Sequence, residues 1–242
     1  MYQQPRFLLG GDRALYVDLG DSISPELNQR VGSLVNAIDS ASIPGIEDLS
    51  PTYRSILVYY DPLKITLDEL KERLAASARE ATKTPPKRSQ VVEVPTAYGG
   101  EFGPDLGFVA SHNRLTEEEV VRIHSGSDYL VYMLGFNPGF PYLGGLSERI
   151  ATPRLNTPRV KIPAGSVGIA ESQTGVYPLD SPGGWRLIGR TPIRIFDPTR
   201  DPPVIAQAGN YVRFVPVDEA RYGEIEQQVK AGTYQVTTRE TA

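Results

Sequence analysis

Arginines are the side chains best suited to chemistry in this sequence, and they gather in its second half. Residues 135–203 hold eight lysines and arginines against five acidic residues, although the whole chain carries a net charge of −4. Guanidinium groups bind carboxylates and phosphates through two parallel hydrogen bonds. Arg154 and Arg159 each follow a proline, which stiffens the local backbone. We expect these two arginines to recognise an anion; the alternative is that they are solvated or pair with local acids.

The segment Gly135–Leu146 (GFNPGFPYLGGL) combines turn-forming and aromatic residues within a short stretch. It contains two prolines, four glycines, two phenylalanines and one tyrosine. Glycine lets a backbone approach a ligand closely, and aromatic rings offer a stacking surface. We therefore expect Phe136, Phe140 and Tyr142 to line a groove. The alternative is a corner of a β-barrel that aromatic packing fills.

Residues for metal or nucleophilic chemistry are scarce. The sequence has no cysteine and two histidines, His112 and His124, which excludes a thiol nucleophile and a multi-histidine metal centre. We expect no metal site. His124 is predicted to end a helix. It would act either as an acid or base near Gly135–Leu146 or as a terminal histidine that interacts with the helix dipole.

Two segments of the sequence partly resemble known motifs, the P-loop and the G-x-S-x-G serine motif, but match neither. Gly184–Thr191 (GWRLIGRT) has Arg190 where a P-loop needs lysine, and Pro192 follows where the phosphate-binding helix would begin. Ser166 does not stand in a G-x-S-x-G pattern, so a hydrolytic serine triad is not indicated. If a nucleotide is bound, we expect it to bind in another way or on a partner.

The first 85 residues have the pattern of a small α/β domain. The expected order is strand, helix, strand, strand, helix, strand, at Ala14–Leu19, Ser24–Ile38, Ile46–Leu49, Ser55–Tyr60, Thr66–Ala78 and Val91–Val94. Ser24 before Pro25, and Thr66 before Glu69, are helix-start signals. Pro44 and Gly45 would stop the first helix. This order predicts a ferredoxin-like sandwich, which the strand after a polar, proline-rich linker at 82–89 would close.

Residues 86–242 have the pattern of a compact β-barrel. Residues 135–203 hold 11 of the 21 prolines and 10 of the 23 glycines, together with aromatic residues that argue against disorder. Short strands joined by glycine and proline turns are typical of barrels and sandwiches. We expect strands at Tyr129–Leu134, Ser166–Ala170, Trp185–Ile188, Ile193–Phe196 and Tyr211–Val215 and helices at Thr116–Ile123 and Asp218–Lys230.

Composition and charge indicate which classes of partner the protein binds and in which compartment we expect it. A net charge of −4 argues against bulk electrostatic binding to nucleic acid or to an anionic membrane. The sequence has no apolar run of about 18 residues, which a membrane-spanning helix requires. Its first residues lack the basic and apolar regions of a secretory signal. We therefore expect a cytoplasmic protein.

Several long motifs in this sequence resemble those of one bacterial family, the KipI/PxpB family, also called allophanate hydrolase subunit 1. The matching segments are LGGDRALYVDLG, PTYRSILVYYDP, YGGEFGPDL, GFNPGFPYLGGL, ATPRLNTPR, PAGSVGIA, QTGVYP, SPGGWRLIGRTP and FDPTRDPP. The resemblance covers nearly the whole chain. It implies an α+β protein with a small N-terminal ferredoxin-like α/β domain (1–85) and a C-terminal cyclophilin-like β-barrel domain (86–242).

The resemblance also implies a shared enzyme. Members of this family are expected to pair with a KipA/PxpC-type subunit and, with a third subunit of the LamB/YcsF type, to form an ATP-dependent 5-oxoprolinase that opens 5-oxoproline to glutamate. ATP would phosphorylate the lactam oxygen and so prepare the amide carbon for attack by water. Arginines that neutralise the developing phosphate charge are the contribution expected from this chain.

The expected site residues come from motif positions, from the aromatic groove and, for His124, from the predicted end of a helix. The catalytic candidates are Arg154, Arg159 and His124, and the candidates for substrate binding are Phe136, Phe140, Tyr142, Gln173, Tyr177, Trp185 and Arg190. Two residues depart from the family pattern. Glu171 stands where glycine is usual, and Ser147 stands where aspartate is usual.

Two other functions stay open. One branch of the resembling family inhibits autophosphorylation of a histidine kinase, and an aromatic groove could bind a proline-containing segment of such a kinase. Related domains also occur in urea carboxylase, where they belong to a carboxyltransferase. The sequence has no biotin-carrier segment, and a free-standing subunit favours the 5-oxoprolinase assignment.

Overall fold

The computed structural model describes residues 1–83 and 89–241, and the chain divides into two compact units, Met1–Lys87 and Arg88–Ala242. Each unit has its own hydrophobic core. The predicted linker at 82–89 lies mostly outside the described residues. Among the residues that the structure describes, no helix is long and apolar enough to cross a bilayer.

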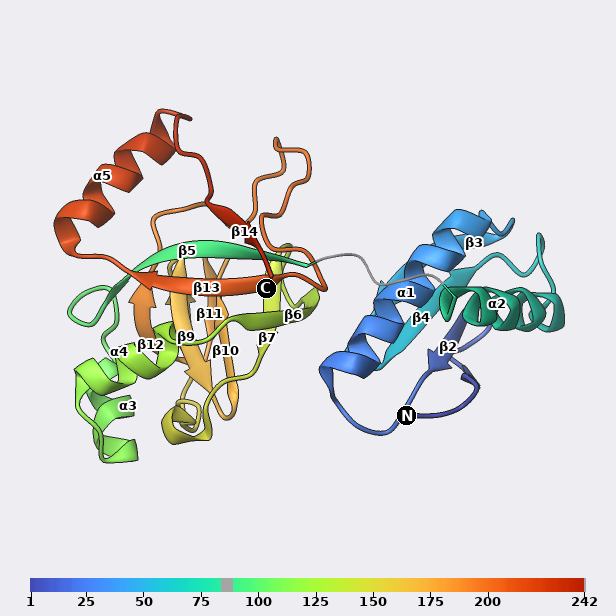
Figure 1. The fold of residues 1–242 in the computed structure, drawn as a ribbon, viewed down its shortest axis with the longest axis horizontal. Helices are drawn as coiled ribbons and strands as arrows, with labels where there is room; N and C mark the ends of the chain where they lie inside the picture. Colours follow the sequence, from blue (N-terminus) through green and yellow to red (C-terminus); the bar gives the residue numbers. More distant parts are fainter. Residues whose placement is uncertain (84–88, 242) are drawn as a thin grey trace. The chain divides into compact units, whose positions relative to one another are not determined.

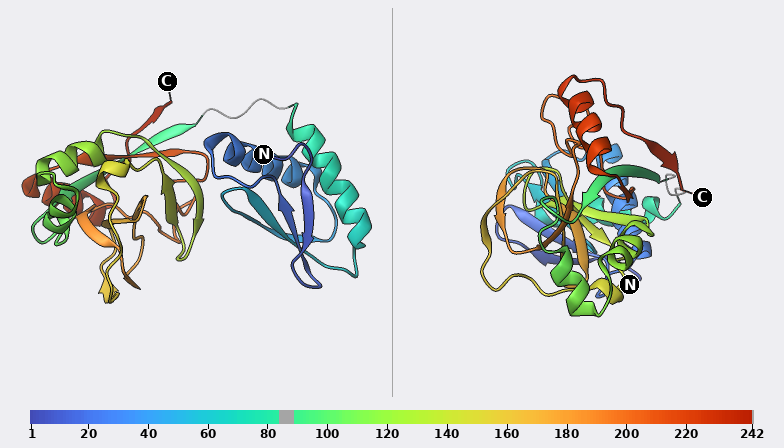
Figure 2. Two further views of the ribbon diagram at one scale, coloured as in Figure 1. Left: turned by 90° about the horizontal axis from the view of Figure 1, so that it is seen from below. Right: turned by 90° about the vertical axis from the view of Figure 1, so that its left-hand side faces the viewer.

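The first unit is a four-stranded antiparallel sheet with two helices against one face (Figures 1 and 2). In sheet order the strands are β1 (Arg6–Leu9), β2 (Ala14–Asp18), β4 (Ser55–Tyr60) and β3 (Ile46–Pro51). The helices are α1 (Pro25–Ala41) and α2 (Leu67–Ala81). Their apolar stripes bury against alternate residues of β2 and β4, which form one core.

The helix-start signals in this unit are confirmed. The Ser24 hydroxyl accepts a hydrogen bond from the Leu27 N–H at 3.2 Å, and Thr66 accepts one from the Glu69 N–H at 3.3 Å. Such caps satisfy backbone donors that the first helical turn leaves without partners. Helix α1 ends at Ser42, whose backbone is left-handed, shortly before the predicted stop.

One expectation for this unit is wrong. The strand after residue 88 does not close the N-terminal sheet but belongs to the barrel as β5 (Gln90–Tyr98). The edge position next to β2 is taken by β1, which forms a hairpin with β2 across Gly10 and Gly11. Strand β5 has six buried positions out of nine, a pattern that suits the interior of a closed barrel better than the edge of a small sheet.

The second unit is a closed barrel of seven strands. Around the barrel they are β5, β12 (Arg186–Arg190), β9 (Ser166–Ala170), β10 (Gln173–Val176), β7 (Phe140–Gly144), β6 (Tyr129–Gly135) and β13 (Tyr211–Pro216). The barrel closes because β12 pairs with both β9 and β5, and β13 runs parallel to β5 (Figure 1). The predicted fold class, a small α/β domain followed by a barrel, is confirmed.

Shorter elements surround the barrel. They are α3 (Leu106–Asn113), α4 (Glu117–Ser125), the 3₁₀ turn η1 (Glu148–Ile150), the pair β8 (Arg159–Ile162) and β11 (Ser181–Gly183), α5 (Glu219–Lys230) and β14 (Thr238–Glu240). The capping box of α4 is complete, since Thr116 and Glu119 bond each other's backbone N–H. Helices α3 and α4 lie side by side (Figures 1 and 2).

In this unit the pattern misses one helix and wrongly predicts one strand. The pattern does not predict helix α3, because its polar and apolar residues do not separate into clear faces and its N-cap residue, Asp105, makes no side-chain capping bond. Ile193–Phe196 is predicted to be a strand but forms only one isolated bridge, between Phe196 and Val204. The preceding Pro192 lacks the N–H that a strand ladder needs.

Candidate functional site

Aromatic side chains gather on the barrel in a second core beside the main one. We call Phe140, Tyr142, Tyr177 and Trp185 the outer aromatic cluster. The Phe140 ring centroid lies 5.4 Å from those of Tyr142 and Tyr177 and 5.5 Å from that of Trp185, in edge-to-face geometry. Such pairs are the favoured arrangement of aromatic rings. The cluster therefore forms a defined wall rather than a loose collection of rings.

Strand alternation explains why this cluster is separate from the barrel core. Val176 belongs to the interior core, whereas its neighbour Tyr177 belongs to the outer cluster. On β12, Ile188 likewise belongs to the interior core, whereas its neighbour Leu187 packs with the outer aromatic cluster. Successive side chains along a strand point to opposite faces, so one short strand can supply both cores.

Two glycines make room for the cluster. A Cβ at Gly175 would lie 3.1 Å from Cζ3 of Trp185 and 3.2 Å from Cζ of Phe140. A Cβ at Gly168, on the neighbouring strand β9, would lie 3.2 Å from Cβ of Trp185. Because both positions have no side chain, the rings pack directly on the backbone of β9 and β10.

Arg154 lies beside this wall. Its guanidinium carbon is 6.0 Å from the Trp185 ring centroid, and its side chain is exposed. Burial raises the pKa of Tyr177 to about 12, and the charges of Arg154 and Arg159 oppose that rise. Tyr177 is therefore a neutral hydroxyl near neutral pH. Tyr177 and Trp185 are 2% and 6% exposed, so Arg154 is an exposed guanidinium beside a buried aromatic cluster. An exposed guanidinium suits a carboxylate or a phosphate.

Arg159 is held by its neighbours. Its Nη2 donates to Oδ1 of Asp105 at 2.8 Å, and its Nη1 donates to the Trp185 carbonyl at 3.3 Å. Its guanidinium therefore contacts the backbone of the cluster rather than solvent alone. Arg154 and Arg159, which share the same sequence pattern, thus have different surroundings.

His124 lies inside the barrel. Its side chain is fully buried, and its ring packs against Tyr129 and Phe214 with centroid distances of 5.5 and 4.6 Å. Burial lowers the pKa of His124 to about 3. The residue is therefore neutral near neutral pH and does not act as a cation at the helix terminus. The structure places it in the main core, not in the outer aromatic cluster.

The remaining candidates divide between two regions. Phe136 joins the edge of the cluster, 5.5 Å from the Phe140 ring, and is 61% exposed. Gln173 starts β10 opposite Ala170, which packs with the outer aromatic cluster. Arg190 is at the opposite end of β12 from Trp185, and its charge acts on Asp180 and Tyr222. The structure therefore gathers most of the candidates but not His124 or Arg190.

Sequence reasoning missed three residues around this cluster. Gly168 and Gly175 carry no chemistry of their own, so only the ring packing reveals their part. Asp105 precedes an apolar run and has the position of a helix cap, yet its carboxylate bonds elsewhere. The one signal available was its place in the family motif YGGEFGPDL.

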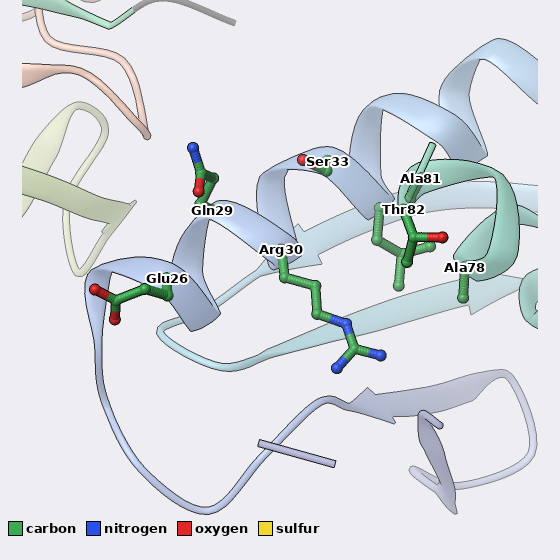
Figure 3. A pocket seen from close by; sticks show the side chains of 8 residues that line it. Glu26, Gln29, Arg30, Ser33, Ala78, Ala81 and Thr82 are labelled. Carbon is green, nitrogen blue, oxygen red and sulfur yellow. The ribbon is translucent and has the colours of Figure 1, made fainter. Parts of the chain in front are cut away.

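A separate hollow of about 250 Å³ lies in the first unit, between α1 and α2 (Figure 3). Its lining is Glu26, Gln29, Arg30, Ser33, Leu34, Ala78, Ala81 and Thr82. Arg30 donates to the carbonyls of Tyr2 and Gln3, so it ties the N-terminal segment to α1. None of the predicted site residues lines this hollow.

Metal-binding geometry is also lacking in the part of the chain that the structure describes. Residues 1–83 and 89–241 contain no group of three or more histidines and acidic residues that could hold a metal ion.

Comparisons with known proteins agree with this architecture. Residues 5–206 match the family model described as carboxyltransferase domain, subdomain C and D. The chain is 44% identical over 226 residues to the 5-oxoprolinase B subunit of Bacillus subtilis, covering 88% of this chain and 92% of that protein. It is 43% identical over 218 residues to the 5-oxoprolinase B subunit of Escherichia coli O157:H7, covering 90% and 98%.

Solved structures give the same picture. A conserved uncharacterized protein from Pyrococcus horikoshii is 49% identical, with a TM-score of 0.54 over 90% of this chain and 100% of that one. The Kluyveromyces lactis urea carboxylase is 23% identical, with a TM-score of 0.78 over 98% of this chain and 24% of that one. At such low identity, the second match shows a shared fold alone.

Proposed function

Since this chain belongs to the carboxyltransferase subdomain C and D family, and within it to the KipI/PxpB family with the 5-oxoprolinase B subunits, we propose that it is one subunit of an ATP-dependent 5-oxoprolinase. The complex opens the lactam of 5-oxoproline to give glutamate. One geometric observation supports this proposal. Arg154 lies beside the Trp185 ring, and its charge lowers the pKa of Tyr177. These groups match the carboxylate and the flat lactam of the substrate.

The chemistry requires help from other subunits. A lactam is a poor electrophile, and transfer of a phosphoryl group from ATP to its oxygen makes the ring carbon open to attack by water. Arg154 would bind and orient the substrate carboxylate while the half-buried Tyr142 contacts the ring. We assign ATP to the complex and not to a particular subunit. The partners proposed are a KipA/PxpC-type and a LamB/YcsF-type chain.

Reconstitution tests this proposal. The chain is expected to be inactive alone, and its co-expression with both partner types should yield glutamate from 5-oxoproline and ATP. Arg154→Ala should raise the KM for 5-oxoproline about tenfold or more, because a charge-assisted hydrogen bond contributes about 1.5–3 kcal/mol. Arg149→Ala, at an exposed arginine of the same unit, is the control. A complex that assembles but never converts 5-oxoproline rejects the proposal.

A second function rests on Phe136. This residue is 61% exposed, and its backbone has a φ of 57°, a conformation that is costly for a bulky side chain. An exposed, strained aromatic at the rim of a cluster favours contact with another protein, such as a histidine kinase. Suppression of kinase autophosphorylation by the lone chain at stoichiometric levels would support this function, and a Phe136→Asn variant that suppresses it equally well would count against it.

A further inference from the structure

Asp105 connects the start of α3 to strand β12. Its backbone N–H donates to the Leu187 carbonyl at 2.8 Å, and its Oδ2 accepts from the Leu187 N–H at 2.7 Å. Its Oδ1 accepts from Nη2 of Arg159 at 2.8 Å. The residue is 8% exposed. Both carboxylate oxygens are therefore used, each by a different segment, and neither caps α3.

Arg159 extends this connection to Trp185 itself. Its Nη1 donates to the Trp185 carbonyl, while Asp105 holds the N–H of Leu187 two residues later. The backbone directly after Trp185, from its carbonyl to the Leu187 N–H, is thus held by one ion pair. We call Asp105 and Arg159 the clamp.

The clamp also adjoins the segment that carries Arg154. Arg159 begins β8, and the segment from Arg154 to Arg159 leads into that strand. In the same segment, the Leu155 N–H donates to the Gly184 carbonyl at 2.7 Å, directly before Trp185. The segment with Arg154 and the segment with Trp185 are consequently tied together at both ends of their contact.

We propose that Asp105 is a positioning residue, which acts through Arg159 to hold the Trp185 ring and the Arg154 segment in the arrangement that receives substrate. Arg159 is then part of the support of the site, and Arg154 is the arginine that contacts the substrate. This inference rests on the proposed function for its substrate. The clamp itself is defined by the hydrogen bonds of the chain alone.

Trp185 provides a direct readout, because it is the only tryptophan in the sequence. In the isolated full-length chain, Asp105→Asn should raise the acrylamide quenching constant of tryptophan fluorescence at least twofold, since the ring is released from its buried position. Arg159→Lys should do the same. A lysine keeps the charge but has one ammonium group, which cannot span the Asp105 carboxylate and the Trp185 carbonyl.

Asp128→Asn is the matched control. Asp128 forms a short ion pair with Arg213 in the same unit, at 2.6 Å, and also bonds Arg239. Neither arginine contacts the outer aromatic cluster through an ion pair or ring contact that involves Asp128. This variant should leave quenching unchanged even if it lowers stability. Equal quenching in the wild-type and Arg159→Lys chains, or an equal rise in Asp128→Asn, overturns the clamp. Arg159→Lys decides the question if Asp105→Asn fails to fold.

The reconstituted complex tests the link to substrate. Asp105→Asn should lower kcat/KM for 5-oxoproline at least tenfold, and the double variant Asp105→Asn with Arg159→Lys should be no worse than either single variant, because the two residues act as one unit. An active complex whose kcat/KM is unaffected by Asp105→Asn overturns the positioning role. A wild-type complex without turnover instead overturns the proposed function, and quenching still decides the clamp.

Discussion

The backbone at Glu171 and Ser147 shows why glycine and aspartate suit these two positions. Glu171 lies between β9 and β10 with a φ of 52°, in the left-handed region that glycine adopts without cost. Ser147 caps the turn η1, and its hydroxyl accepts from the Arg149 N–H as an aspartate would. Neither departure changes the outer aromatic cluster.

His124 shows how a residue with catalytic potential can serve the core instead. Thr174 donates to the Gly168 carbonyl, so its oxygen accepts from Nε2 of His124 at 2.8 Å. Nδ1 is then the acceptor for the Tyr98 hydroxyl, also at 2.8 Å. This chain of bonds links β5, α4, β10 and β9 through the barrel interior. It fixes one neutral tautomer of the imidazole.

A neutral, buried histidine makes stability depend on pH. The pKa of His124 falls from 6.5 to about 3 on folding because burial disfavours the charged form. Its contribution is therefore fully present above pH 6.5 and is lost as the pH falls from 6.5 toward 3. Between pH 7 and pH 5 we expect the free energy of unfolding to fall by about 2 kcal/mol from this group.

Urea unfolding followed by Trp185 fluorescence at both pH values measures this effect. A His124→Gln chain keeps hydrogen-bonding atoms but does not titrate, so its loss of stability between the two values should be smaller by that amount. Equal losses in both chains would show that His124 is not buried in its neutral form.

At the scale of elements, strands β9 and β10 make room for the outer aromatic cluster because each has a position without a side chain. Each has a glycine on the face that the aromatic rings cover, at Gly168 and Gly175. The opposite face of the same strands supplies Val167, Ile169 and Val176 to the main core. The glycines leave room for the large aromatic rings, so both faces of these strands are closely packed.

Gly175→Ala tests this packing. The added methyl group would come within 3.1–3.2 Å of Trp185 and Phe140, so the rings must shift. We expect a loss of about 1–3 kcal/mol in the free energy of unfolding, with a change in Trp185 fluorescence. Gly184→Ala is the control, because its Cβ would meet no atom closer than 3.7 Å and should change stability by less than about 0.5 kcal/mol. Equal effects at both positions would contradict the packing argument.

At the scale of the whole molecule, the two units have separate cores. The core of the first unit is built from α1, α2 and its own sheet, and that of the second from the barrel strands and the elements around them. The barrel also closes on itself through β5 and β12, so it needs no strand from the first unit to complete its ladder. A unit with its own core and closed sheet can fold alone.

A fragment of residues 89–242 should therefore be folded. We expect it to keep the tryptophan emission maximum and acrylamide quenching of the full chain, because the cluster around Trp185 lies wholly within this unit. Circular dichroism and cooperative urea unfolding check the fold. The same fragment with Gly175→Ala provides a destabilised comparison. An unfolded or aggregated wild-type fragment would contradict the prediction.

Local signals determined much of the architecture. The caps at Ser24, Thr66 and Thr116 are satisfied by atoms within four residues, so the sequence alone locates these helix starts. The glycine- and proline-rich composition of 135–203 indicated short strands and a barrel, because those residues favour tight turns. Among the candidate site residues, the aromatic ones are close in sequence or lie in family motifs, and they are candidates on that basis.

Only the tertiary structure shows which residues that are far apart in the sequence form hydrogen bonds and ion pairs. Asp105 and Arg159 are 54 positions apart, and His124 and Thr174 are 50 apart, so no local pattern could pair them. Whether an ionisable group meets solvent or a core depends on which strands close the barrel. The sequence by itself determined the family, the helix starts and the aromatic segment. Only the closed barrel, by burying His124 and tying Arg159 to Asp105, separated supporting residues from the exposed Arg154.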